Sequence, residues 1–324
     1  MDKTIEPEID ALLAKTPFHL PARCRLVPEN RNTACSHAEI EELIQKKILN
    51  RIDLEIMKVL TVFPFLNHHN LQYALTGRLP PEIQKDRYTD NLKKLKTAGI
   101  LLCYYMEEEA APAANTEKER ARDEGEKSVS PLRLYALSQS AYTYMEKIVT
   151  ASNPCCAATG TLIIKQAAAS QFALRFADSY QEQVREIRLQ KTAKNGKDAI
   201  TIDGILQFFP PGGKAEENNL ITIILLSVRE EDGWQAKETA RLKVLSHWLA
   251  GQSEKYLSPV IIFCVEQISM ALSLHTCIQA QSLLSFWEKY YCPDSLLTVY
   301  PPLKALYRCE TDGNGTVRAI RLNP

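Results

Sequence analysis

Cationic and hydrogen-bonding side chains gather on one predicted helix, which begins near Pro81. At about 100° per residue, these side chains lie away from the apolar stripe of that helix. Lysine and arginine suit phosphate oxygens, and a carboxylate can accept a hydrogen bond from the amino group of cytosine in the major groove. The sequence therefore predicts contact with double-stranded DNA. The expected phosphate contacts are Arg87, Lys93 and Lys94, and the candidate base readers are Thr89 and Asp90.

The neighbouring segments predict a helix-turn-helix followed by a two-stranded wing. Apolar residues recur at helical spacing over 51–63 and 88–95, which indicates the first and third helices. Asn67 can cap a short second helix between them. Ahead of the first helix, Ser36 and Glu39 have the spacing of a capping box, which predicts a further helix to about Ile48. Two runs rich in strand formers follow, at 100–106 and 132–137. This order is typical of a winged helix-turn-helix.

Charge permits DNA binding by this region without requiring it. From Arg51 to Met106 the chain has eight Lys and Arg and five Asp and Glu, or 8 − 5 = +3. The segment between the wing strands, 107–130, has eight acidic and four basic residues, so we expect a mobile loop that avoids phosphates. A winged helix used for dimerisation or protein docking stays open as the alternative.

Composition limits the classes of partner. The 324 residues have zero net charge, so any attraction to nucleic acid must be local. The longest apolar run, near 220–228, is too short to span a bilayer, so a cytoplasmic protein without membrane contact is expected. The nine cysteines contain no Cys-x-x-Cys, and the side chains of His68 and His69 diverge by about 100° on a helix, so neither predicts a metal site.

The second half alternates strand-like and helical segments. The apolar run at 220–228 suits a strand buried on both faces, and Asn195-Gly marks a hairpin turn. This pattern indicates an α/β sheet. Helices are expected at 161–180, 236–249, 268–281 and 282–290, and strands at 184–191, 199–209, 220–229, 260–265, 296–300, 305–309 and 317–322.

The order helix, strand, hairpin, buried strand, helix, strand resembles the core of the PD-(D/E)xK nuclease fold, with Asp203 on the second strand. Joined to a winged helix, it resembles the replication-relaxation family of plasmids and conjugative elements, over most of the chain after about residue 45. The resemblance implies a fold of class α+β or α/β in three parts. These are an N-terminal arm at 1–36, a winged helix-turn-helix domain at 37–150, and a restriction-endonuclease-like α/β domain at 158–324.

In that nuclease fold, an aspartate on the second strand and a Glu-x-Lys on the third hold a divalent metal ion. Asp203 matches the first position, but Ser227 and Arg229 stand where Glu-x-Lys is expected. One metal-binding carboxylate is missing, so the resemblance implies a vestigial site without catalytic residues, metal or cofactor. Asp203 could equally be a hairpin aspartate bonded to backbone donors.

The expected function is that of a DNA-binding accessory or regulatory protein of a mobile genetic element, acting in replication, transfer or transcription. The second domain would be a non-catalytic scaffold. One alternative is a metal-dependent nuclease that combines Asp203 with an acid from Glu230 to Asp232. Another is a protein-interaction module that does not bind DNA. A protein partner or a homodimer stays open.

Overall fold

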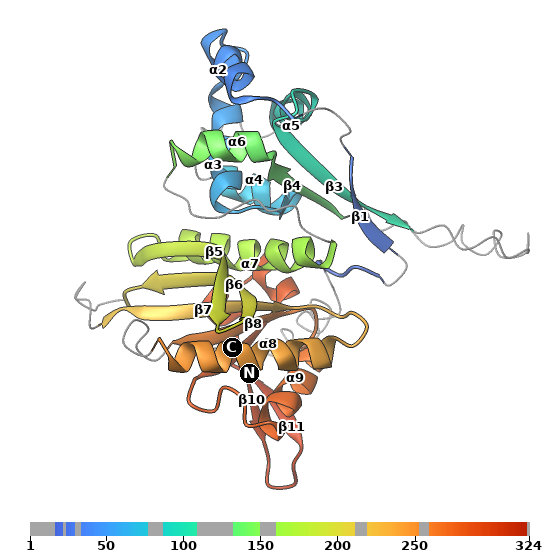
Figure 1. Cartoon of the computed structure of the whole chain (residues 1–324), viewed down its shortest axis with the longest axis vertical. Helices are drawn as coiled ribbons and strands as arrows, with labels where there is room; N and C mark the ends of the chain where they lie inside the picture. The colour runs from blue at the N-terminus through green and yellow to red at the C-terminus, as the bar shows by residue number, and fades with distance from the viewer. Residues whose placement is uncertain are drawn as a thin grey trace, which may run out of the picture.

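The computed structural model describes residues 17–21, 24–29, 34–76, 87–108, 132–149, 160–210, 219–252 and 259–322. These residues form eight α-helices and two sheets, so the fold is mixed α and β. Figure 1 shows the two sheets one above the other, with helix α7 (Gly160–Ser179) between them. Most of the predicted wing loop, the linker at 151–156 and the first 16 residues of the arm lie outside the described residues.

The first unit, residues 17–149, is built on a sheet of four antiparallel strands in the order β1-β3-β4-β2. Five helices accompany it. Four of them, with the short strand β2, lie between β1 and β3 in the chain. The elements are β1 (Cys24–Pro28), α2 (His37–Gln45), α3 (Arg51–Val62), β2 (Leu66–Asn67), α4 (His68–Thr76), α5 (Arg87–Thr97), β3 (Leu101–Glu108), β4 (Arg133–Leu137) and α6 (Gln139–Glu146).

Side-chain caps fix where the helices of this unit begin. Ser36 and Glu39 form the capping box that their spacing predicts, and it starts α2. Asn50 and Asp53 form a second capping box at the start of α3. The Asn67 side chain accepts a hydrogen bond from the backbone N–H of Asn70 at 2.8 Å, as expected for a cap of α4.

The second unit, residues 160–322, is built on a sheet of seven strands in the order β11-β10-β9-β8-β7-β6-β5. Strands β7, β8 and β9 are parallel, and the other neighbours are antiparallel. Helix α7 packs on β5, β6 and β7, while α8 and α9 lie on the opposite face (Figure 1). The remaining elements are β5 (Val184–Asn195), β6 (Asp198–Phe208), β7 (Ile221–Val228), α8 (Trp234–Ala250), β8 (Val260–Val265), α9 (Ile268–Ala280), β9 (Lys289–Pro293), the 3-10 helices η4 (Asp294–Thr298) and η5 (Pro302–Lys304), β10 (Tyr307–Thr311) and β11 (Val317–Arg321).

Most predicted elements of this unit are confirmed. All residues of β7 after Ile221 are buried, as expected of a strand covered on both faces. The predicted turn at Asn195-Gly joins β5 to β6, and Gly196 has a φ of 61°, which a residue without Cβ adopts at no steric cost. The sheet is nonetheless mixed, since β7 pairs antiparallel with β6 and parallel with β8.

Two predictions for the C-terminal part of the chain were wrong. The expected helix at 282–290 is a series of turns, because Ser282 and Leu284 have positive φ values of 51° and 53°, which no helix accommodates. The expected strand at 296–300 is mainly the 3-10 helix η4, and the strand β9 precedes it. The described part of the arm is packed, since β1 pairs with β3 and Phe18 is buried.

Helix α7 also joins the two units through polar contacts to α4. The guanidinium of Arg175 lies 3.5 Å above the ring of Tyr73, whose hydroxyl donates a hydrogen bond to Asp178. The Asn70 amide donates to Gln171 at 3.3 Å, in a buried position. The units therefore share α7 as a common wall.

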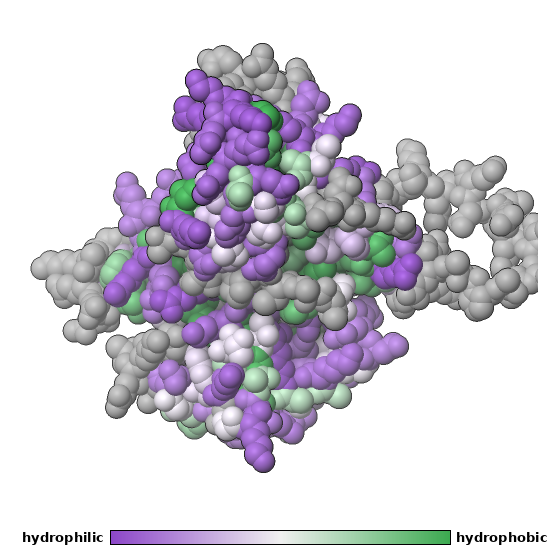
Figure 2. Space-filling model, turned by 45° about the horizontal axis from the view of Figure 1, so that its top comes forward, coloured by the Kyte–Doolittle hydropathy of each residue, from purple (hydrophilic) through white to green (hydrophobic). Residues whose placement is uncertain are grey.

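Hydrophilic side chains cover most of the face in Figure 2, and hydrophobic ones lie in small groups. Among the described helices, none has the length and apolar character needed to cross a membrane.

Candidate functional site

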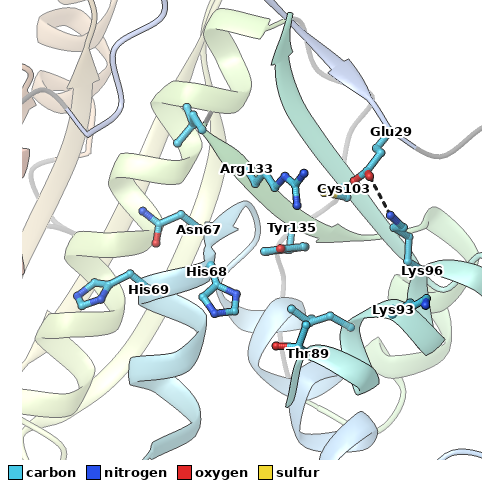
Figure 3. Close-up of a pocket in the computed structure, with 12 residues that line it drawn as sticks. Glu29, Asn67, His68, His69, Thr89, Lys93, Lys96, Cys103, Arg133 and Tyr135 are labelled. Carbon is cyan, nitrogen blue, oxygen red and sulfur yellow. Dashed lines mark ion pairs between the residues drawn. The ribbon is translucent and has the colours of Figure 1, made fainter. Parts of the chain in front are cut away.

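A groove of about 670 Å³ lies between α5, the start of α4 and the strands β3 and β4 (Figure 3). Its wall combines cationic, histidine and aromatic side chains from α5 and from segments that precede and follow α5 in the chain. The lining residues are Glu29, Asn67, His68, His69, Thr89, Leu92, Lys93, Lys96, Cys103, Leu132, Arg133 and Tyr135.

Helix α5 presents one stripe to this groove. Thr89, Lys93 and Lys96 follow each other at steps of four and three residues, so they lie on one face of the helix. Tyr88 and Leu95 are buried on the inner side and fix the orientation of that face. Lys93 is exposed and forms no ion pair with any residue that the structure describes. Two of the predicted DNA contacts, Thr89 and Lys93, therefore line the same groove.

The groove is cationic overall. The ammonium of Lys96 forms an ion pair with Glu29 at 2.9 Å, and Arg133 projects from the start of β4 on the same side (Figure 3). Hydrogen bonding to Lys96 lowers the pKa of Glu29, and the charge of Arg133 adds to this effect. Lys93, Lys96 and Arg133 against one carboxylate give 3 − 1 = +2, with the histidines counted as neutral.

The histidine pair lies in the first turn of α4, at the edge of the groove (Figure 3). The ring of His68 packs against that of Tyr88, with centroids 5.0 Å apart. Burial lowers the pKa of both histidines. The charge of His69 lowers the pKa of His68 further, and the charge of Arg175 lowers that of His69. Both are therefore neutral at pH 7 and become cationic only in more acidic solution.

Lys94 does not line the groove, and its partly exposed side chain is tied to a buried carboxylate. Its ammonium forms an ion pair with the buried carboxylate of Asp53 and donates to the carbonyl of Ile48 at 3.1 Å. The Asn91 amide donates to Asp53 at 2.6 Å. These contacts fasten α5 to the start of α3, so the structure assigns Lys94 to packing and not to the accessible surface with Lys93.

The other two predicted contacts differ in position. Asp90 is exposed on α5 but does not line the groove. Arg87 is the first residue of α5, and its side chain lies outside the described part of the chain.

Asp203 lies in a buried charge network in the second unit. Its Oδ2 accepts a hydrogen bond from the backbone N–H of Ser227 at 2.6 Å and one from Arg241 of α8 at 2.7 Å. Arg241 also pairs with Glu238 at 3.2 Å, and Glu238 accepts from Lys165 of α7 at 2.5 Å. Burial raises the pKa of Glu238, but Arg241 and Lys165 outweigh this and leave it below its ordinary value.

The three residues of the predicted vestigial site therefore separate into two clusters. Ser227 meets Asp203 only through its backbone N–H. Arg229 is buried and forms an ion pair with Asp294 at 3.0 Å, and its Nη1 donates to the carbonyl of Cys264 at 3.2 Å. Burial raises the pKa of Asp294 to about 7. The positive charge of Arg229 opposes this rise, and the negative charge of Glu266 adds to it. The guanidinium beside Asp203 is therefore that of Arg241, and it occupies the space where a metal ion would bind.

One group of side chains in the described residues has metal-binding geometry. The ligand atoms of His19, Glu230 and Glu266 all lie within 4.8 Å of one another. They line a cavity of about 640 Å³ next to the ends of β7 and β8. The sequence analysis named Glu230 only as a possible partner of Asp203 and gave His19 no role.

Sequence reasoning also missed Lys96, Arg133 and the histidines as groove residues. Helical spacing alone places Lys96 on the stripe of Thr89 and Lys93, so that signal was available. Arg133 approaches the groove only because β4 pairs with β2 and β3, and a strand pairing of this kind is not visible in local spacing.

Comparison with known proteins gave no match, whether to a family model, to a curated protein or to a solved structure. The chemistry of the chain must therefore be inferred from its own residues.

Proposed function

We propose that the chain binds double-stranded DNA through α5 and the groove beside it. The observation that carries this proposal is the convergence of Thr89 and Lys93 from α5 with Arg133 from β4 on one accessible, cationic groove (Figure 3). Phosphate contacts need accessible cations, and base contacts need a helix that can enter the major groove. This groove offers both side by side.

The order of the elements supports the same proposal. Helix α3, strand β2, helices α4 and α5, and the strands β3 and β4 follow one another as in a winged helix-turn-helix, with β2 pairing to β4. In helix-turn-helix proteins the later helix lies in the major groove. Here that helix is α5, which carries the exposed stripe.

The proposed DNA contacts differ from those predicted from the sequence, because the structure shows which side chains of α5 line the groove. Lys93 and Arg133 are the principal phosphate contacts, and Lys96 joins them once it leaves Glu29. Thr89 and Asp90 are the base readers, and Arg87 stays a predicted contact. Lys94 is not included, because its ion pair with Asp53 holds it in the fold.

The second unit would be a nuclease-like scaffold without catalysis. The order α7, β5, β6, β7, α8, β8 matches the resemblance to the PD-(D/E)xK core. Arg241 neutralises Asp203, and a metal ion there would have to displace a buried guanidinium. The resemblance to the replication-relaxation family would make this a DNA-binding accessory or regulatory protein of a mobile genetic element.

The test is binding of a fluorescent duplex of random sequence by the whole protein, over a series of salt concentrations. The affinity should fall steeply with salt, because each phosphate contact adds about 0.9 to the slope of log K against log salt. Lys93→Ala and Arg133→Ala should each weaken binding to every sequence and reduce that slope by about 0.9.

Lys243→Ala is the matched control, because it removes the same charge from an exposed position on α8. It should leave affinity and slope unchanged. An equal effect of Lys243→Ala would show that only the net charge matters and would contradict the proposal. Absence of binding at low salt would also contradict it and would favour a protein-interaction module.

A further inference from the structure

The cavity beside β7 and β8 joins three segments that are distant in sequence. Glu230 follows the end of β7 by two residues, and Glu266 directly follows β8. These strands are parallel, with Val228 opposite Val265, so both carboxylates reach the same edge of the sheet. His19 comes to this edge from the N-terminal segment, 247 residues before Glu266. The carboxyl ends of parallel strands are where open α/β sheets bind ligands.

Hydrogen bonds orient the carboxylate of Glu266 toward the other two side chains. Its Oε1 accepts from the backbone N–H of Glu230 at 3.0 Å, and its Oε2 contacts the Nδ1 of His19 at 2.7 Å. Glu266 is buried with a side chain only 2% exposed, whereas that of His19 is 33% exposed. One carboxylate is thus fixed, and the imidazole and Glu230 lie nearer to solvent.

We propose that His19, Glu230 and Glu266 bind a divalent transition metal ion such as Mn²⁺ or Zn²⁺. One imidazole nitrogen and two carboxylates are a donor set that these ions accept, whereas Mg²⁺ prefers oxygen ligands alone. The ligand atoms lie within 4.8 Å of one another, so an ion placed among them needs only short movements of the exposed side chains. The ion replaces the contact between His19 and Glu266.

The local charge favours a divalent cation. Glu230 and Glu266 supply two carboxylates, and Arg229 is paired with Asp294, which a pKa of about 7 leaves only partly charged at neutral pH, so the net charge of the group lies between 1 − 2 = −1 and 1 − 3 = −2. A divalent ion cancels this excess. Burial makes an uncompensated charge costly, so neutrality matters most for the buried residues Glu266 and Asp294.

Arg229 supplies an independent indication that the cavity takes a ligand. Only 2% of its side chain is exposed. It lines the same cavity as His19 and Glu230. Its Nε and Nη2 have no hydrogen-bond partner of good geometry among the described residues, although Nη2 is ion-paired with Asp294. Buried guanidinium donors normally have partners. Because these atoms are closed off from the cavity and Nη2 already faces Asp294, only the Nε could bond to an added ligand oxygen, and only after a side-chain movement.

Titration of the whole protein with Mn²⁺, followed by electron paramagnetic resonance, tests the proposal in the absence of DNA. Mn²⁺ is the first probe because the thiolates of the free cysteines prefer softer ions. The free-ion signal should be lost with about one equivalent bound per chain. His19→Ala and Glu230→Gln should weaken binding on the order of tenfold or more, since even the loss of outer-shell partners costs that much.

Asp232→Asn is the matched control, because Asp232 lines the same cavity but lies outside the three-residue group. It should bind Mn²⁺ as the unmodified protein does. Glu230 is exposed, so Glu230→Gln should fold normally. Circular dichroism checks that His19→Ala and Glu230→Gln are folded. Absence of saturable binding, or equal weakening in all three variants, would overturn the proposal.

Discussion

The groove beside α5 and the cavity beside β7 and β8 differ in the sign of their charge. The groove carries cations, of which Lys93 is exposed and available, while the cavity carries carboxylates from Glu230 and Glu266. A chain of zero net charge therefore has two opposite local fields, and each can attract a partner that the whole molecule would not. We infer that net charge is a poor guide to the partners of such a chain.

The two units also use buried charge in different ways. Lys94 and Asp53 join two helices at a boundary where Lys94 keeps a 31% exposed side chain. Arg241 lies between the carboxylates of Asp203 and Glu238, whose side chains are 1% and 2% exposed. Loss of the more deeply buried cation should cost more stability.

The largest expected effect is that of Arg241→Met on the second unit. It leaves the buried carboxylate of Asp203 without a charged partner and leaves Glu238 with Lys165 alone, so the free energy of unfolding should fall by about 3–5 kcal/mol. Urea denaturation followed by tryptophan fluorescence measures it. Lys237→Met on the same helix is exposed and should change stability by less than about 0.5 kcal/mol. Similar values for the two would remove the distinction between buried and exposed charge.

Lys94→Met should have a smaller effect on the first unit. The free energy of unfolding should fall by about 1–3 kcal/mol, because Asp53 loses a charged partner but keeps its hydrogen bond from Asn91. The salt dependence of DNA binding should not change. Lys93→Met should do the reverse, with normal stability and a lower salt slope. A lower salt slope for a stable Lys94→Met protein would return Lys94 to the DNA-contacting set.

Glu29→Gln should strengthen DNA binding. The substitution removes the one carboxylate that lines the groove, so the groove gains one unit of net positive charge and the salt slope should become steeper by up to about 0.9. Glu42→Gln, which releases Lys46 on α2 away from the groove, is the control and should leave the slope unchanged. A weaker affinity of Glu29→Gln would mean that Glu29 positions the groove and does not oppose the DNA.

The smallest expected effect is a pH dependence of DNA binding. The pKa values of His68 and His69 are lowered, so both are mostly neutral near pH 7 and gain protons only in more acidic solution. The added positive charge should raise DNA affinity in that range. The same protonation lowers folding stability, because each histidine has a lower pKa in the folded than in the unfolded state.

Affinity is therefore measured by fluorescence anisotropy between about pH 5.5 and pH 7.5, where circular dichroism checks that the protein is folded. Replacement of both His68 and His69 by Gln should flatten the pH dependence. An unchanged profile in that variant would exclude the histidines as its source.

Local patterns predicted much of the fold. The capping box at Ser36, the buried run of β7 and the hairpin at Asn195 depend on neighbours a few residues apart, and all three are confirmed. Helical spacing also placed Thr89 with Lys93. It could not distinguish Lys94, because the carboxylate that holds Lys94 lies on another helix, 41 residues earlier.

Local patterns could not predict the cavity beside β7 and β8. Its ligands are single residues that follow separate strands, or lie in the N-terminal segment, and no local spacing relates them. Only the parallel register of β7 and β8 brings Glu230 beside Glu266. The same limit explains why Asp203 was compared with Ser227 and Arg229 on the next strand, whereas its charged partner is Arg241 from a helix.

Strand β1 has a further consequence for the solubility of the chain. It pairs with β3 from Cys24 opposite Glu108 to Pro28 opposite Tyr104, and so covers the outer edge of that sheet. Removal of the first 29 residues would leave the backbone N–H and C=O groups of this edge unpaired, which is a template for strand addition between molecules. With β1 present, the edge strand has five residues and ends in Pro28, whereas without it the eight-residue β3 would form the edge. Short edge strands and proline hinder strand addition, so shortened forms should precipitate or form oligomers more readily.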